Sequence, residues 1–218
     1  MSLSKSEIRQ IAQKAVTIFE SAGLTCCLFG GAACELNGCS RTPNDVDLIV
    51  MTSSYTTETL KNTLVAGGGG DFYTRPSKMI GATYRLLFCR IPTSSLFAHK
   101  SCKVDILIPG IMNLPMLPTS SFVRIDNLPV LPFSALLLMK VQGWSDHRKS
   151  ERSDYRLKQH QDAKDVNELL AIGKERGERL TPETLPSDFW LAGMKLIVEY
   201  VNVKGGRMSW EELGLQFS

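Results

Sequence analysis

Residues 28–50 read LFGGAACELNGCSRTPNDVDLIV, and this stretch decides the fold. A short apolar run is followed by two glycines, a segment whose alanine, glutamate and leucine content favours helix, a polar loop, and a run rich in valine and isoleucine. This order predicts a strand, a tight turn, a helix and a second strand, with the first strand at 25–29, the turn at Gly30 and Gly31, and the second strand at 45–51.

Two carboxylates stand at the beginning of the second strand. Side chains two positions apart in a strand point to the same face, so Asp45 and Asp47 are presented side by side while Val46 turns into the core. A third carboxylate, Asp105, lies in the apolar segment KVDILIP at 103–109. If that strand lies beside the first, the three carboxylates form one cluster.

Clustered carboxylates favour a divalent metal. Like charges repel and raise one another's pKa, and a hard cation such as Mg²⁺ or Mn²⁺ removes that cost by binding the oxygens. Two such ions clamp the attacking and leaving oxygens of a phosphoryl displacement, which defines the expected reaction class. At Gly30 and Gly31, the absence of a Cβ lets a phosphate approach the backbone at the beginning of a helix.

The rest of the chain divides into two halves. Helices are expected at 4–21 and 55–65, a loop at 67–70, and strands at 72–73, 83–91 and 103–109, which gives a mixed sheet of about five strands flanked by helices. Beyond Pro132 the pattern is helical, with helices at 133–144, 161–172 and about 187–203. We therefore expect an α/β (α+β) domain at 1–130 and a helical C-terminal region at 131–218 packed on it.

The motifs resemble the nucleotidyltransferase superfamily, which has the polymerase beta-like fold. The matching text is LFGGAACELNGCSRTPNDVDLIV together with KVDILIP, and the pattern is closest to the antibiotic-modifying, minimal and abortive-infection type members. The resemblance implies that Gly30 and Gly31 contact phosphates and that Asp45, Asp47 and Asp105 are catalytic metal ligands. It also implies that Asp105 is the general base.

The helical half carries a second part of the resemblance. LPFSALLLMKVQGW and QDAKDVNELL resemble a lysine-bearing helix and a Lys-Asp-x-x-Asp helix of those members, and Asp162 and Asp165 match the two acids. Lys140 would then approach the nucleotide phosphates or pair with one of those acids. The chain departs from the pattern at Ala32, where many members carry serine or threonine, and at Gln161, where a lysine would precede the first acid.

The implied activity is transfer of NMP from a nucleoside triphosphate, ATP above all, to a hydroxyl of a small molecule or protein, with release of pyrophosphate. Arg41, four residues before Asp45, is a further candidate nucleotide contact, although a loop arginine is more often a solvated or locally paired surface group. The alternatives are a non-catalytic nucleotide-sensing or toxin/antitoxin-type interaction module, and an RNA nucleotidyltransferase.

The composition and net charge limit the classes of partner that the chain is expected to bind. The 218 residues carry 25 basic and 22 acidic side chains, so the net charge of +3 does not favour nucleic acid, although contact with it stays open. The basic tract at 147–164 could flank a polyanion, but charged segments between helices are usually solvated. No apolar run reaches the length of a membrane helix, and a cytoplasmic location is expected. The six cysteines lack metal-ligand spacing and are expected to be reduced and structural.

Overall fold

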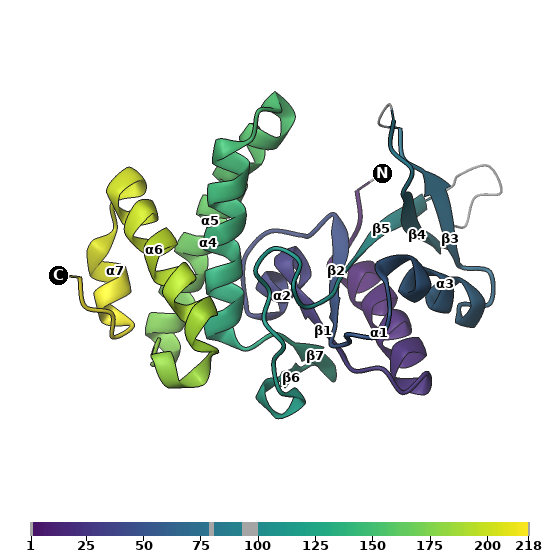
Figure 1. The fold of residues 1–218 in the computed structure, drawn as a ribbon, viewed down its shortest axis with the longest axis horizontal. Coiled ribbons are helices and arrows are strands. Elements are labelled where there is room, and N and C mark those ends of the chain that lie inside the picture. Colours follow the sequence, from purple (N-terminus) through teal and green to yellow (C-terminus); the bar gives the residue numbers. More distant parts are fainter. Residues whose placement is uncertain (1, 79–80, 93–99, 218) are drawn as a thin grey trace.

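The computed structural model describes residues 2–78, 81–92 and 100–217, which form seven strands and seven α-helices in an elongated molecule (Figure 1). The sheet lies at one end and the C-terminal helices lie at the other. The strands are β1 (Cys26–Phe29), β2 (Asp45–Val50), β3 (Phe72–Pro76), β4 (Arg85–Ile91), β5 (Lys100–Leu107), β6 (Val123–Ile125) and β7 (Leu128–Val130). The helices are α1 (Lys5–Ser21), α2 (Gly30–Leu36), α3 (Thr57–Gly67), α4 (Phe133–Lys149), α5 (Ser153–Arg176), α6 (Ser187–Lys204) and α7 (Arg207–Glu212).

All seven strands form one mixed sheet in the order β3-β4-β5-β2-β1-β7-β6. The central strand β2 runs antiparallel to β1 and parallel to β5, so the N-terminal ends of β2 and β5 lie at the same edge. The expected fold class, a mixed sheet with a helical C-terminal part, is confirmed.

The first helix shows how local sequence positions the sheet. Ser4 caps α1 by accepting a hydrogen bond from the Glu7 backbone N–H, and the Glu7 side chain returns a bond to the Ser4 backbone. This capping box fixes the start of the helix. The apolar stripe of α1, which includes Val16 and Phe19, is then fully buried against the sheet and α3.

The C-terminal helices bury their own aromatic cluster. Trp144 of α4, Tyr200 of α6 and Trp210 of α7 are each almost completely buried, and their rings meet edge to face with centroids 4.8 and 6.0 Å apart. Strands end at Val130, and the described residues from Phe133 onward form only helices and connecting segments. A domain boundary at 130/131 stays a prediction.

The structure differs from the expected elements at the charged segment, at two short strands and at α7, which follows the last expected helix. Helices α4 and α5 run through most of the charged segment at 146–158, because its lysine, arginine and glutamate residues are good helix formers and only 150–152 connect the two helices. The short strands β6 and β7 were not expected, because three residues carry too little periodicity and Pro129 is untypical of a strand.

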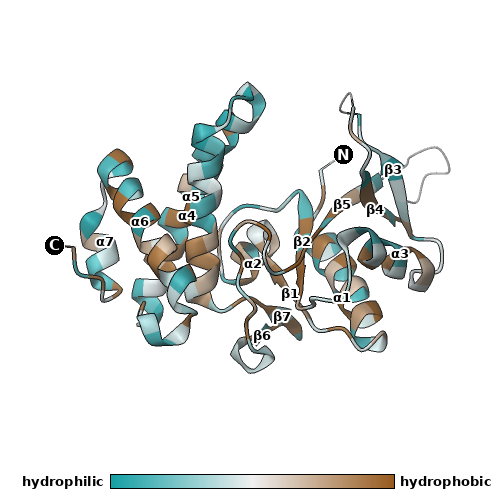
Figure 2. Cartoon of the chain, viewed as in Figure 1, coloured by the Kyte–Doolittle hydropathy of each residue, from teal (hydrophilic) through white to brown (hydrophobic). Residues whose placement is uncertain are grey.

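Hydropathy follows this architecture. Apolar residues concentrate in β1, β2 and the inner faces of the helices, whereas the far end of the α4–α5 hairpin is hydrophilic (Figure 2). All six cysteines are buried and free of disulfides, which agrees with a packing role. In the part of the chain that the structure describes, every helix is too short or too polar to cross a bilayer.

Candidate active site

Three carboxylates meet at the edge where β2 and β5 run parallel. Asp47 and Asp105 are directly paired across the two strands, and Asp45 lies one pleat away on the same face. One oxygen of each carboxylate lies within 4.8 Å of the others, and all three residues are half-buried. The predicted convergence of Asp45, Asp47 and Asp105 is therefore present in the structure.

The glycine turn lies directly against this cluster. Gly30 has a φ of +60°, and a Cβ at this position would lie 2.1 Å from Asp47 Oδ2, so both the backbone conformation and the space require glycine. The backbone N–H of Gly31 donates a hydrogen bond of 3.4 Å to the same Asp47 oxygen. The turn thus brings the beginning of α2 and a carboxylate of β2 together.

The electrostatic environment of Asp47 is unfavourable to its negative charge. Burial, followed by the charges of Asp45 and Asp105, raises the pKa of Asp47 to about 7, against smaller lowering contributions from Lys140 and the Gly31 N–H. Lys103, on the same face of β5, pairs with Asp105 at 2.5 Å and supplies one local positive charge. The cluster remains rich in uncompensated negative charge, as a cation site requires.

Comparison with known proteins gives a match in structure. No protein-family model matches the sequence, and no curated protein matches it. Among solved structures, the chain is similar to an antigenic nucleotidyltransferase-like protein from Paracoccidioides brasiliensis, with a TM-score of 0.66, 16% identity, and coverage of 100% of this chain and 97% of that chain. This chain has a nucleotidyltransferase-like fold.

Other solved structures align along most of the chain with lower similarity. JHP933 from Helicobacter pylori gives a TM-score of 0.47 at 13% identity and covers 98% of this chain and 95% of that chain. The antibiotic-resistance factor ANT(2'')-Ia gives 0.46 at 11% identity, with 94% and 99% covered. The match with a TM-score of 0.66 establishes the nucleotidyltransferase-like fold, and its 16% identity leaves the activity to the site itself.

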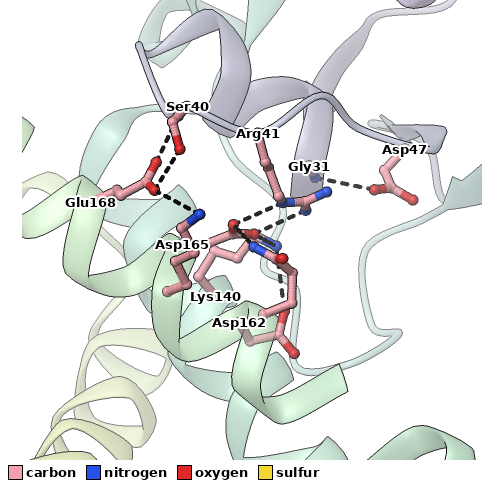
Figure 3. A network of polar contacts seen from close by, with 10 residues as sticks. Gly31, Ser40, Arg41, Asp47, Lys140, Asp162, Asp165 and Glu168 are labelled. Atoms are coloured by element: carbon pink, nitrogen blue, oxygen red, sulfur yellow. Dashed lines mark hydrogen bonds and ion pairs between the residues drawn. The ribbon is translucent and has the colours of Figure 1, made fainter. Parts of the chain in front are cut away.

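The structure places the two candidate phosphate-binding cations in an ion-pair network (Figure 3). Arg41 donates hydrogen bonds of 2.8 and 2.9 Å to the two carboxylate oxygens of Asp165, and Lys140 Nζ lies 2.7 Å from one of them, Oδ2. Lys140 also lies 3.4 Å from Asp162. Of the two roles open for Lys140, pairing with the α5 acids is therefore observed, and its contact with a nucleotide stays a prediction, as does that of Arg41.

The network also holds the nucleotidyltransferase-like sheet to the C-terminal helices. The Ser40 backbone N–H and hydroxyl donate hydrogen bonds of 2.6 and 2.7 Å to Glu168, and Gln161 donates one of 2.9 Å to Asp165. Gln161 thus contacts the acid pair from the position where a lysine was expected. Ser40 and Glu168 are 128 positions apart and belong to no sequence motif, so their contact is seen only in the folded chain.

The basic tract at 147–164 is largely engaged within the helices. Arg148 and Lys149 pair with Glu199 of α6, at 2.5 and 2.8 Å. His147 Nδ1 lies 2.5 Å from Asp162, which links the end of α4 to the acid pair. The interpretation of this tract as a surface of locally satisfied charges is therefore favoured for these residues.

Proposed function

We propose that this chain is a metal-dependent nucleotidyltransferase that moves NMP from a nucleoside triphosphate, with ATP as the expected donor, to a hydroxyl acceptor. The observation that carries this proposal is the cluster of Asp45, Asp47 and Asp105 within 4.8 Å, on neighbouring parallel strands of a nucleotidyltransferase-like fold. A fold alone does not define an activity, and here the site supplies the chemical argument.

The donor set fits a hard divalent cation. Carboxylate oxygens are the ligands that Mg²⁺ and Mn²⁺ prefer, and bringing three of them together is costly without positive charge, as the raised pKa of Asp47 indicates. Asp45, Asp47 and Asp105 would hold the ions. Bound there, the ions would neutralise charge developing on the phosphates.

The chain's own groups define the remaining chemistry. The acceptor oxygen forms a bond to the α-phosphorus, the bond from that phosphorus to the oxygen bridging the β-phosphate breaks, and pyrophosphate leaves with the bonding electrons. A carboxylate oxygen of Asp105 takes the proton of the acceptor hydroxyl. The phosphates would contact the backbone of the Gly30–Gly31 turn at the beginning of α2, which lies directly against Asp47 and Arg41.

Arg41 and Lys140 support the donor site through position and charge. The charge of Lys140 reaches the acid cluster, since it lowers the pKa of Asp47 against the larger effects that raise it. The Arg41 guanidinium lies beside the phosphate-binding turn, because a Cβ on Gly31 would come within 2.7 Å of one of its nitrogens. Both cations therefore lie where a triphosphate would be attracted.

The test is calorimetric titration of ATP, CTP, GTP and UTP with Mg²⁺, followed by a pyrophosphate-release assay. The variant with Asp45→Asn and Asp47→Asn should lose metal-dependent triphosphate binding and about three orders of magnitude in pyrophosphate release, because the ions provide several kcal/mol of stabilisation. Asp154→Asn removes an exposed carboxylate of α5 and is the matched control, expected to behave as wild type.

Two results would contradict the proposal. Equal release by wild type and the double variant would exclude the carboxylate cluster as the active site. If no triphosphate binds to the wild type, the chain would instead be a non-catalytic interaction module that retains the fold.

A further inference from the structure

An aromatic and cationic surface lies next to the carboxylate cluster on the same face of the sheet. The strand register forms one row across four adjacent strands, in which Tyr73 pairs with Phe88, Phe88 with Lys103, and Lys103 with Asp45. Neighbouring strands lie about 4.8 Å apart, so Phe88 is about 10 Å from the strand position of Asp45. A few nucleotides of a single strand span that distance.

The side chains of this surface form a stack. The rings of Tyr73 and Phe88 have centroids 5.9 Å apart and planes inclined by 25°. The Arg75 guanidinium carbon lies 5.0 and 5.2 Å from the two centroids, and that of Arg90 lies 4.4 Å from the Tyr73 centroid. Alternating rings and guanidinium groups provide flat faces together with positive charge. We call Tyr73, Arg75, Phe88 and Arg90 the β3–β4 platform.

Core packing does not account for the platform. On the opposite face of this half of the sheet, Phe72 and Leu87 are buried, and α3 packs against β3 with Leu60 and Leu64 buried. Tyr73 and Phe88, by contrast, are half-buried and lie outside the buried core. Their face of the sheet therefore retains aromatic surface that a ligand can contact.

The two arginines have no compensating acid among the described residues. Arg75 donates to the Tyr73 hydroxyl at 2.8 Å, and Arg90 donates to the Gly70 carbonyl oxygen, and neither forms an ion pair with a carboxylate of the described residues. The undescribed stretches 79–80 and 93–99 contain no aspartate or glutamate. Other arginines of the chain form ion pairs with carboxylates, as Arg9, Arg41 and Arg148 do. Positive charge on the platform is thus available to an anionic ligand.

We propose that the β3–β4 platform binds the acceptor of the reaction, and that this acceptor is the hydroxyl-bearing end of a single-stranded nucleic acid. Bases would stack on the rings and guanidinium planes, while Arg75 and Arg90 contact phosphates. Because the row of paired residues continues from Tyr73 to Asp45, a nucleic acid bound along it would have its end at the carboxylate cluster. This inference rests on the proposed function and reverses the preference for a small-molecule or protein acceptor that the overall charge favours.

The experiment measures binding of a fluorescein-labelled single-stranded RNA of about 12 nucleotides by fluorescence anisotropy at low salt. Arg75→Gln combined with Arg90→Gln should weaken binding about tenfold or more and flatten its salt dependence, because two phosphate contacts are lost. Phe88→Leu should weaken it about fivefold or more through lost stacking. Arg85→Gln is the matched control, since this arginine of β4 bonds to Thr74 on the other face, and it should change affinity less than about twofold.

Several outcomes would overturn the inference. These are an absence of RNA binding by the wild type, equal binding by wild type and the Arg75→Gln, Arg90→Gln variant, or an Arg85→Gln defect as large as that of the double variant. Binding of poly-glutamate in place of RNA, with the same dependence on Arg75 and Arg90, would assign the platform to an acidic protein.

A second assay separates this inference from the proposed function. Incubation of the same RNA with α-labelled ATP and Mg²⁺ should label the RNA with wild type and fail with the Asp45→Asn, Asp47→Asn variant. That variant should still bind RNA at least as tightly as wild type, because two negative charges next to the platform are gone. Platform-dependent binding without transfer from any triphosphate would reject the proposed function and retain the platform as a nucleic-acid surface.

Discussion

The molecule contains two clusters of aspartates whose electrostatic environments are opposite. At the sheet edge, Asp47 faces two other carboxylates, and burial together with their charges raises its pKa to about 7. In α5, burial also opposes ionisation of Asp165, but the hydrogen bond from Arg41 and the charge of Lys140 outweigh it, so its pKa lies below the ordinary value. In the first cluster Lys103 pairs with Asp105 alone, whereas Arg41 and Lys140 pair directly with the α5 acids.

This difference separates two uses of the same side chain. The α5 acids are neutralised by the protein's own cations, so they stabilise the contact between the sheet and the helices. The carboxylates of the sheet edge repel one another, and under the proposed function an external cation would neutralise them. Substitutions in the two clusters should therefore have opposite effects on stability.

The largest stability effect is expected for Asp165→Asn. Loss of this charge leaves Arg41 and Lys140 without their shared partner at a site where the Asp165 side chain is 1% exposed, and unfolding free energy should fall by about 3 kcal/mol. Urea denaturation measures this change. Asp47→Asn should be neutral or stabilising in the absence of metal. Equal destabilisation by both substitutions would contradict the distinction between the clusters.

A smaller effect is expected from the metal. Mg²⁺ or Mn²⁺ at about ten times its dissociation constant should raise the melting temperature of wild type by about 3 °C, because it binds only the folded chain. Differential scanning fluorimetry with the Asp45→Asn, Asp47→Asn variant provides the control, in which the shift should disappear. A shift that persists there would place the metal elsewhere.

The two clusters should also give opposite pH dependences in metal-free buffer. Because the folded pKa of Asp47 is raised, folding binds a proton between about pH 4 and 7, and wild type should lose stability relative to Asp47→Asn as the pH rises through that window. The folded pKa of Asp165 is lowered, so its contribution is present above about pH 4 and is lost below it. Urea denaturation of wild type, Asp47→Asn and Asp165→Asn at about pH 3 to 8 measures both contributions to the unfolding free energy. If the unfolding free energies of Asp47→Asn and Asp165→Asn, each relative to wild type, changed with pH in the same direction, this assignment would be rejected.

The smallest effect is expected at the edge of the network. Ser40→Ala removes the hydroxyl that donates to Glu168 but retains the backbone N–H bond to the same carboxylate, so the loss should be about 1 kcal/mol. Glu168→Gln tests the same contact from the other side. A loss from Ser40→Ala as large as that from Asp165→Asn would show that the bridge depends on Ser40 more than on the buried ion pairs.

The sequence predicts the carboxylate cluster because its signals are local. The Gly30–Gly31 turn and the two-residue spacing of Asp45 and Asp47 determine the turn and the shared face within one short stretch, and only the place of Asp105 depends on strand pairing. The Arg41–Asp165 pair, by contrast, joins residues 124 positions apart, so no local pattern encodes it.

The β3–β4 platform had a local signal that can be recognised. An aromatic residue followed two positions later by arginine occurs at Tyr73 and Arg75 and again at Phe88 and Arg90, which in strands places each pair on one face. Their convergence needs the antiparallel register of β3 and β4. Whether that face looks toward the carboxylates or toward α3 depends on the position of the helices, which the strand pattern does not determine.

The most direct test of the central claim is a Mn²⁺ titration followed by electron paramagnetic resonance, with a non-hydrolysable ATP analogue present. Wild type and Asp154→Asn should bind Mn²⁺ and remove the signal of the free ion, and the Asp45→Asn, Asp47→Asn variant should not. Equal Mn²⁺ binding by all three proteins would contradict the assignment of the sheet-edge carboxylates as the metal site of a nucleotidyltransferase.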